Sequence, residues 1–273
     1  MTDKRPIGVF DSGLGGLTAV KELMKIMPLE NIIYFGDTAR VPYGSRSNDT
    51  IVRYAMQDMK FILGHKVKAV LVACGTVSSV AIDQVESMSP VFVTGVVQAS
   101  VNAAISQTKN NKIGVIATQA TINAGTYQKL IKQKQPNTEV FAIACPLFVP
   151  LVENGYTKKE NVAVQKIAND YLSELKEKNI DTLILGCTHY PVLIDVIADI
   201  MGKDVILVNS SRESVLLLAS RLDERGMSLK SAKKNGICKY FVSDNVHGFS
   251  QLANNILGSK EVFGHVEKVD IGN

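Results

Sequence analysis

The stretch VKAVLVACGT, residues 67–76, is an apolar run that stops at Cys74, and a similar pattern returns as IDTLILGCTH, residues 180–189, which stops at Cys187. A short run rich in Val, Ile and Leu is typical of a strand buried in a parallel sheet. In α/β folds such strand ends bind ligands, because unpaired N–H groups of helix N-termini collect there. Each cysteine therefore occupies a candidate binding position. The alternative is that both are small buried hydrophobes.

Comparable apolar runs alternate with amphipathic stretches along the whole chain. The runs are IGVFD, NIIYFGD, VKAVLVAC, VFVTGVV, IGVIAT, EVFAIAC, IDTLILGC and VILVNS. This alternation predicts an α/β fold with mainly parallel sheets. The runs also form two ordered sets of four, since IGV at 7–9 returns at 113–115 and Cys74 returns as Cys187. We therefore expect two pseudo-symmetric α/β domains, each a four-stranded unit covered by helices, with the active site in the cleft between them.

The composition excludes several classes of protein. With 273 residues, 46% of them hydrophobic and 21% charged, the chain can bury a sizeable core. The net charge of +4 comes from scattered lysines and arginines, which does not favour nucleic-acid binding. No apolar run approaches the roughly 18 residues of a membrane span, and no signal-peptide core begins the sequence, so we expect no membrane contact and a cytoplasmic location.

Four cysteines stand far apart in the sequence. They are Cys74, Cys145, Cys187 and Cys238. No C-x-x-C pair and no Cys/His pair at zinc-finger spacing occurs, so the pattern predicts neither a disulfide framework nor a metal site. Each of the four cysteines is therefore expected either to pack in a core or to act in catalysis.

Two thiols at equivalent strand ends would lie on either side of a molecule bound in the cleft. Such a pair suits the inversion of a carbon centre, in which one group removes a proton from one face and the other returns a proton to the opposite face. Thr76 and Thr188 follow the cysteines and can donate hydrogen bonds to a thiolate. Asp11 and His189 are titratable groups that can assist the proton transfers. Each also has a purely structural explanation, because an Asp at a strand end is often a helix cap and a His beside a turn is often hydrogen-bonded locally.

Two glycine-containing turns are candidates for holding carboxylates. The run from Gly13 to Gly16 does not match G-x-G-x-x-G and no P-loop lysine follows, so no nucleotide cofactor is expected. Ser12 and the N–H groups after it can instead hold a carboxylate at the start of a helix. The turn VPYGSRS, residues 41–47, can hold a second carboxylate through the Tyr43 hydroxyl and the Gly44 amide, unless it is a plain loop.

Six motifs together resemble those of glutamate racemases, in the cofactor-independent aspartate/glutamate racemase superfamily. The motifs are GVFDSGLGGL, YFGDTARVPYG, VLVACGT, NKIGVIAT, ACPLFVPLVENG and LILGCTHYPVL, and they extend over nearly the whole chain. The resemblance implies an isomerase without cofactor or metal and two α/β domains around the active site. It places one domain at residues 1–97 plus 208–273 and the other at 98–207. Members of the family are often dimers, so a homodimer is also an expectation.

The resemblance also implies roles for individual residues. Cys74 would deprotonate D-glutamate and Cys187 would deprotonate L-glutamate. Asp11 and His189 would assist, and Glu153 is a further catalytic candidate. The positions that match the substrate's surroundings are Asp11, Ser12, Pro42, Tyr43, Gly44, Gly75, Thr76, Thr188 and His189. Cys145 and Cys238 are expected to pack. The implied function is the supply of D-glutamate for peptidoglycan synthesis, and thereby for cell wall biogenesis and cell shape.

The chain departs from the family at Gly75, where the usual run is Cys-Asn-Thr. Loss of an amide that contacts the substrate predicts weak glutamate racemisation, which Gly75→Asn would improve. The alternative is that Ser78 or Ser79 has taken over the role of the amide. Two other functions stay open on this ground: a binding or regulatory paralogue with little turnover, and a racemase of a related amino acid such as aspartate.

Overall fold

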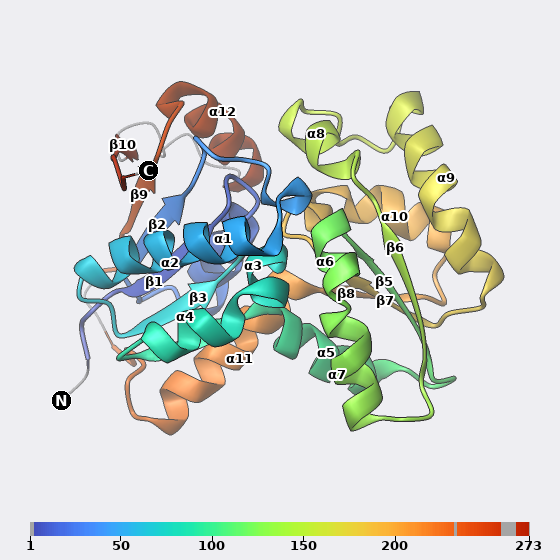
Figure 1. Ribbon diagram of the computed structural model, residues 1–273, viewed down its shortest axis with the longest axis horizontal. Helices are drawn as coiled ribbons and strands as arrows, with labels where there is room; N and C mark the ends of the chain where they lie inside the picture. The colour runs from blue at the N-terminus through green and yellow to red at the C-terminus, as the bar shows by residue number, and fades with distance from the viewer. Residues whose placement is uncertain (1–2, 232–233, 258–265, 273) are drawn as a thin grey trace.

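The computed structural model describes residues 3–231, 234–257 and 266–272 and shows two lobes side by side, each built on its own sheet (Figure 1). The sheet of the first lobe has the strand order β10-β9-β2-β1-β3-β4, and that of the second lobe has the order β6-β5-β7-β8. All pairings in both sheets are parallel. The strands are β1 (Ile7–Asp11), β2 (Ile32–Gly36), β3 (Ala69–Val72), β4 (Phe92–Gly95), β5 (Lys112–Ala117), β6 (Glu139–Ala144), β7 (Thr182–Leu185), β8 (Ile206–Asn209), β9 (Cys238–Val242) and β10 (Val266–Lys268).

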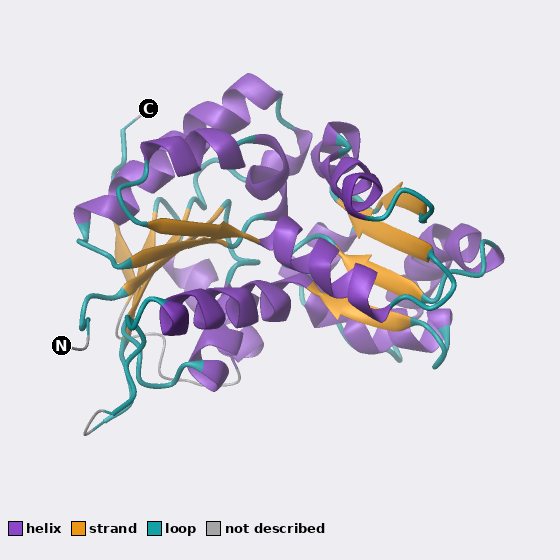
Figure 2. Ribbon diagram, turned by 90° about the horizontal axis from the view of Figure 1, so that it is seen from below, coloured by secondary structure: helices purple, strands orange, loops and turns teal. Residues whose placement is uncertain are grey.

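Helices cover both faces of each sheet (Figure 2). In the first lobe, α1, α11 and α12 pack on one face and α2, α3 and α4 on the other. In the second lobe, α8, α9 and α10 lie on one face and α5 and α7 on the other. The helices are α1 (Leu17–Ile26), α2 (Asn48–Gly64), α3 (Gly75–Val80), α4 (Ile82–Met88), α5 (Val96–Gln107), α6 (Gln119–Ala124), α7 (Thr126–Lys134), α8 (Phe148–Glu153), α9 (Val162–Glu177), α10 (Ile194–Met201), α11 (Ser210–Glu224) and α12 (Val246–Leu257), with short 3-10 turns at Tyr43–Ser45 and Tyr190–Leu193.

The predicted fold class is confirmed, and the internal repeat is visible in the strand order. Strands β2-β1-β3-β4 of the first sheet correspond to β6-β5-β7-β8 of the second. The expectation of four strands in each half is wrong for the first lobe, where β9 and β10 extend the sheet beyond β2. The sequence pattern missed them because β9 is a single short run outside the repeat and the described part of β10 has only three residues, two of them exposed.

The strands of the two sheets mostly fall on the expected sides of the domain division. However, β8 pairs with β7 as far as Asn209, beyond the expected boundary at 207/208. Helix α5 starts at Val96 and packs in the second lobe, so the boundary at 97/98 would fall inside its first turn. We propose boundaries at about 95/96 and 209/210 instead. Among the described residues, no helix combines the length and apolar character needed to cross a bilayer.

Polar residues begin several of the longer helices and explain where these start. The side chain of Ser47 accepts a hydrogen bond from the Thr50 N–H at the start of α2. Asn161 and Asn209 cap α9 and α11 in the same way, each accepting two backbone N–H groups. Such caps satisfy N–H groups that have no partner within the helix. Local sequence therefore determines the starts of helices that flank both sheets.

Candidate active site

A cavity of about 300 Å³ lies between the two lobes, at the carboxyl ends of strands from both sheets. Its wall comes from the segments after β1, β3, β5 and β7, from the Val41–Ser45 loop and from the start and end of the α8 region. The lining residues are Ser12, Val41, Pro42, Tyr43, Gly44, Ser45, Cys74, Gly75, Thr76, Thr118, Gln119, Pro146, Val149, Pro150, Glu153, Cys187, Thr188 and His189. All the predicted site residues therefore line the cavity except Asp11, which is fully buried beneath it.

Both predicted thiols line this cavity, one from each lobe. Cys74 comes two residues after the end of β3, and Cys187 two residues after the end of β7, the corresponding strand of the other sheet. Their side chains are largely buried, with 4% and 6% of the residue exposed. Cys145 and Cys238 are also buried, but they pack in the hydrophobic cores of the second and first lobes. The cavity thus contains the two strand-end thiols and excludes the other two.

Cys187 begins a chain of polar contacts that runs through His189 to Glu153. The Cys187 Sγ lies 3.8 Å from His189 Nδ1, and His189 Nε2 lies 3.0 Å from Glu153 Oε1. Burial disfavours the charged imidazole, but the hydrogen bonds to Cys187 and Glu153 outweigh this effect and raise the pKa of His189 to about 10. At neutral pH the imidazole therefore carries a proton that it can donate to the sulfur of Cys187.

Cys74 has different surroundings. Its Sγ lies 3.4 Å from the Ser12 hydroxyl, and Asp11, the residue before Ser12, ends β1. Burial and the charge of Asp11 raise the pKa of Cys74 to about 12, against the opposing effect of the hydrogen bond with Ser12. Burial also raises the pKa of Asp11, although the charge of His189 and the N–H groups of Gly16 and Gly13 oppose this shift. In the free protein Cys74 is therefore a neutral thiol.

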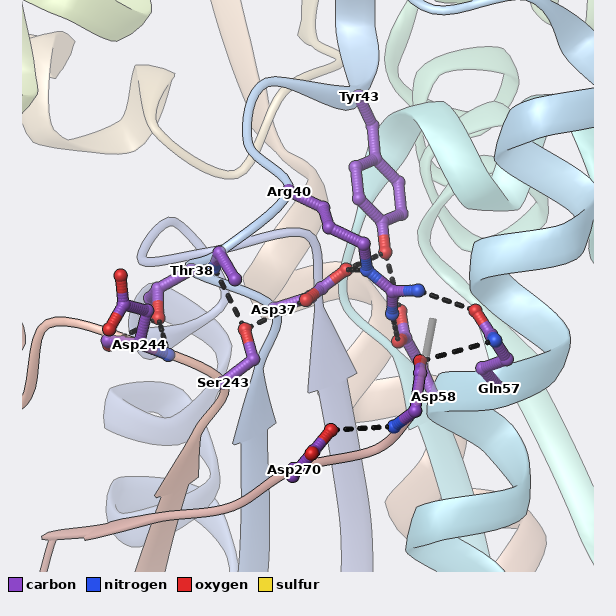
Figure 3. Close-up of polar contacts among 11 residues, drawn as sticks. Asp37, Thr38, Arg40, Tyr43, Gln57, Asp58, Ser243, Asp244 and Asp270 are labelled. Atoms are coloured by element: carbon purple, nitrogen blue, oxygen red, sulfur yellow. Dashed lines mark hydrogen bonds and ion pairs between the residues drawn. The ribbon is translucent and has the colours of Figure 1, made fainter.

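The Tyr43 hydroxyl does not point into the cavity, which corrects the expectation that it holds a carboxylate. It donates to Asp37 Oδ2 and also contacts Asp58 Oδ2, in a buried cluster behind the loop (Figure 3). The single hydrogen of this hydroxyl is donated to a buried carboxyl group, so it is not available to a substrate carboxylate. Tyr43 and its neighbours Pro42 and Gly44 all line the cavity, but the Tyr43 hydroxyl is held in the cluster.

Comparison with known proteins identifies the family. A family model described as Asp/Glu/Hydantoin racemase matches residues 19–211 of this chain. The chain belongs to this racemase family. The glutamate racemases of Geobacter metallireducens and Neisseria gonorrhoeae are 42% and 43% identical to it, over 98% of this chain and 97% and 98% of their own lengths. The crystal structure of the Francisella tularensis glutamate racemase in complex with D-glutamate has a TM-score of 0.90 at 42% identity, and the match covers 98% of each chain. The resemblance indicated by the motifs is thereby confirmed, and the chain is an isomerase.

Sequence analysis missed part of the lining of the racemase cavity. Thr118 follows β5 as Ser12 follows β1, so the internal repeat contained the signal for it. Its hydroxyl lies 3.0 Å from that of Thr76, across the boundary between the lobes. Pro146, Val149 and Pro150 belong to the motif ACPLFVPLVENG, but apolar side chains give no chemical signal of their own.

Close contacts between the lobes explain two glycines at the edge of the cavity. A Cβ atom on Gly75 would lie 2.2 Å from the carbonyl oxygen of Gly186, and one on Gly15 would lie 2.4 Å from both Thr188 Oγ1 and His189 Nδ1. Real Cβ atoms do not approach so closely. In this arrangement the first lobe touches the second through backbone alone at Gly75.

Neither serine after Gly75 replaces the missing amide. Ser78 Oγ donates to the Val72 carbonyl, and Ser79 Oγ donates to the carbonyl of Gly75 itself. Both hydroxyls are therefore engaged with the backbone of the first lobe, and neither residue lines the cavity. The alternative in which Ser78 or Ser79 takes over the amide's role is not supported.

The first prediction concerns the charge on His189. Because its pKa in the folded protein is raised to about 10 from an ordinary value of 6.5, its stabilising contribution is full below about 6.5 and is lost as the pH rises through about 10. We expect NMR titration of the imidazole to give a midpoint near 10, and Glu153→Gln to move it to lower pH because the carboxylate partner is removed. Glu160→Gln, at an exposed position in the same segment, is the control. An unchanged midpoint in Glu153→Gln would show that the contact between His189 and Glu153 is electrostatically unimportant.

Proposed function

We propose that this racemase interconverts L- and D-glutamate by proton transfer between two cysteines, without a cofactor. The observation that carries the proposal is that the thiols of Cys74 and Cys187 line one cavity from corresponding strand ends of the two lobes. The substrate follows from the relatives of 42–43% identity, which are glutamate racemases. The reaction, the two bases and the substrate are inferred together from this placement and this similarity.

The two half-sites differ in a way that suits opposite roles. Cys187, next to the protonated His189, would act as a thiolate and remove the α-proton of L-glutamate. Cys74, a neutral thiol, would donate its proton to the opposite face of the carbanion. The product is D-glutamate, with Cys187 now protonated and Cys74 a thiolate stabilised by Ser12. The reverse reaction exchanges the roles, so protons balance in both directions.

Neutral donors would bind the two carboxylates of the substrate. No lysine or arginine is among the described residues of the lining. Hydroxyl groups of Ser12, Thr76, Thr118 and Thr188 and the amide of Gly44 surround the cavity instead. Such groups bind carboxylates in a site shielded from water, where hydrogen bonds are stronger than in bulk solvent. We assign carboxylate binding to this set. In place of the expected catalytic and substrate-binding role, we propose a positioning role for Asp11, whose buried side chain does not line the cavity but accepts the Gly13 N–H and contacts the Thr188 hydroxyl.

The alternative functions are less favoured. A binding or regulatory paralogue would need only one side of the cavity to be reactive, whereas both thiols are present and both have polar partners. A preference for aspartate has no support from the relatives with the highest similarity described above. Supply of D-glutamate for peptidoglycan in the cytoplasm remains a prediction from the sequence resemblance.

The second prediction separates the two cysteines. We expect Cys74→Ser and Cys187→Ser each to abolish racemisation, because each direction requires both a base and an acid. Each variant should still eliminate a good leaving group from the β-carbon of one enantiomer of a substrate analogue, since this reaction needs only one base. The measurement is the elimination rate for each enantiomer, with Cys238→Ser as the control outside the cavity. Identical behaviour of the two active-site variants toward both enantiomers would contradict the opposed-base mechanism.

The third prediction reverses the expectation for Gly75. The motif comparison predicts that Gly75→Asn improves the enzyme, but a side chain there would meet the Gly186 carbonyl. Overpacking of this kind typically costs about 1–3 kcal/mol. If this cost opposes closure of the cavity, it corresponds to a loss of roughly 5- to 150-fold in kcat/KM.

We therefore expect Gly75→Ala and Gly75→Asn both to lower kcat/KM for L-glutamate, with the larger side chain the more harmful. Gly64→Ala is the matched control, because a Cβ there meets nothing within 4 Å. Steady-state racemisation measured by circular dichroism decides the question. A gain in kcat/KM for Gly75→Asn would support the original expectation and refute the steric one.

The fourth prediction concerns cofactors. The proposed acids and bases are side chains of this chain, so racemisation should survive exhaustive dialysis against a chelator. The dialysed enzyme should show no absorbance typical of pyridoxal phosphate. Recovery of activity only after a metal or coenzyme is added would require a different mechanism.

A further inference from the structure

The loop of residues 41–45 forms one wall of the cavity, and all five of its residues line it. Tyr43, its largest residue, is 1% exposed, and its hydroxyl end points toward a cluster of charged side chains (Figure 3). The position of this wall therefore depends on the groups that hold the Tyr43 hydroxyl.

Two aspartates from different segments contact the Tyr43 hydroxyl, and one arginine bridges the two aspartates. Asp37 follows β2 and Asp58 lies on α2, and both carboxyl groups contact the Tyr43 hydroxyl, the latter at 2.9 Å. Arg40 connects them, with Nε 2.6 Å from Asp37 Oδ2 and an Nη 3.1 Å from Asp58 Oδ1. The side chains of both aspartates are fully buried. Arg40 also donates to Gln57, the residue before Asp58.

A count of hydrogens assigns a proton within this cluster. Asp37 is contacted by three donors, namely Arg40, Tyr43 and Ser243, whose hydroxyl lies 2.8 Å from Asp37 Oδ1. The N–H of Ala39 donates to the Ser243 oxygen, and the hydrogen of the Ser243 hydroxyl is directed to Asp37 Oδ1. Asp37 is thus the carboxylate of the pair.

The Tyr43 hydroxyl has one hydrogen, and Asp37 receives it. Its contact with Asp58 Oδ2 would then bring two oxygens together without a hydrogen, unless Asp58 supplies one. With both aspartates ionised, one guanidinium would also face two buried negative charges. Burial, followed by the charge of Asp37, raises the pKa of Asp58 well above its usual range, which agrees with this assignment. Other charged groups face the cluster: the charge of Asp11 also raises the pKa of Asp58, Asp270 accepts the Gly272 N–H, and Lys268 and Asp244 pair with each other at an exposed edge (Figure 3).

We infer that Asp58, Asp37 and Arg40 are positioning residues for the cavity wall at residues 41–45, and that Asp58 acts as a neutral carboxyl that donates to the Tyr43 hydroxyl. None of the three acts on substrate directly. Their effect on catalysis rests on the proposed glutamate racemisation, whereas their effect on the loop does not.

Matched isosteric substitutions test the assignment. In Asp58→Asn, the new amide N–H can donate to Tyr43 while its oxygen accepts from Arg40, so we expect a KM for glutamate close to that of the wild type. In Asp37→Asn, the amide has one acceptor oxygen where the carboxylate has two, and its N–H group would face the donors that the carboxylate accepts. We therefore expect the KM for glutamate to rise about tenfold or more, with a smaller change in kcat. Asp58→Leu, which cannot donate, should resemble Asp37→Asn. Asp49→Asn, at an exposed position on the same helix, is the control.

Two readouts do not require turnover. Hydrogen exchange at residues 41–45 of the ligand-free protein should accelerate in Asp37→Asn and Asp58→Leu and stay slow in Asp58→Asn. The infrared difference spectrum of wild type minus Asp58→Asn at neutral pH should contain the carbonyl band of a protonated carboxyl group. If the wild type fails to racemise glutamate, the proposed function fails, and these two measurements still test the inference.

Several outcomes would overturn it. If Asp58→Asn raised KM and Asp37→Asn did not, the proton would belong to Asp37 and not to Asp58. A carboxylate band of Asp58 in the infrared difference spectrum would also contradict the assignment. Unchanged exchange and unchanged KM in all variants would show that the cluster does not position the loop. If Asp58→Leu fails to fold, the Asp37→Asn and Asp58→Asn pair decides the matter alone.

Discussion

The packing of the two lobes against each other at the ends of β3 and β7 is the constraint on which the rest of the active site depends. Gly75 and Gly186, the neighbours of the two cysteines, bring backbone against backbone there. Gly75, which makes this contact, also lines the cavity. Hydrogen bonds from Thr18 to the Thr188 carbonyl and from Thr126 to the Ser79 carbonyl also join the lobes around it. A side chain at position 75 would act on this packing before it could act on a substrate.

The strands that position the two cysteines are repeated in the two lobes, but the polar and charged residues beside the cysteines are not. Strands β2-β1-β3-β4 of the first sheet have the same order as β6-β5-β7-β8 of the second, and the two cysteines occupy corresponding positions in it. Their partners do not correspond, because His189 and Glu153 stand beside Cys187 whereas Ser12 and the buried Asp11 stand beside Cys74. The repeat thus places the two thiols, and the non-repeated neighbours give the two thiols different polar partners.

Buried charge around the cavity is arranged in small, nearly neutral groups. His189 and Glu153 form one, and Asp37, Arg40 and Asp58 form another with Tyr43. Each group satisfies its members by hydrogen bonds, which a buried ionic group needs if it is not to destabilise the fold. Each member of the two groups therefore has a partner that fixes its side-chain position in the structure.

The sequence by itself determined the α/β class, the two-lobed repeat, the two thiols at the cavity and most of the other lining residues. These features depend on local patterns, such as buried parallel strands and the residues at their carboxyl ends, which adjacent residues in the chain specify. It also contained the signal for Thr118, through the repeat. Only the tertiary structure decided the direction of the Tyr43 hydroxyl, the contact at Gly75 and the extension of the first sheet by β9 and β10. Each of these features depends on a segment distant in the chain. The Tyr43 hydroxyl depends on Asp58 of α2, the contact at Gly75 depends on Gly186 of the other lobe, and the sheet extension depends on strands near the C-terminus. The distances between such segments arise from tertiary packing, which no local sequence pattern encodes.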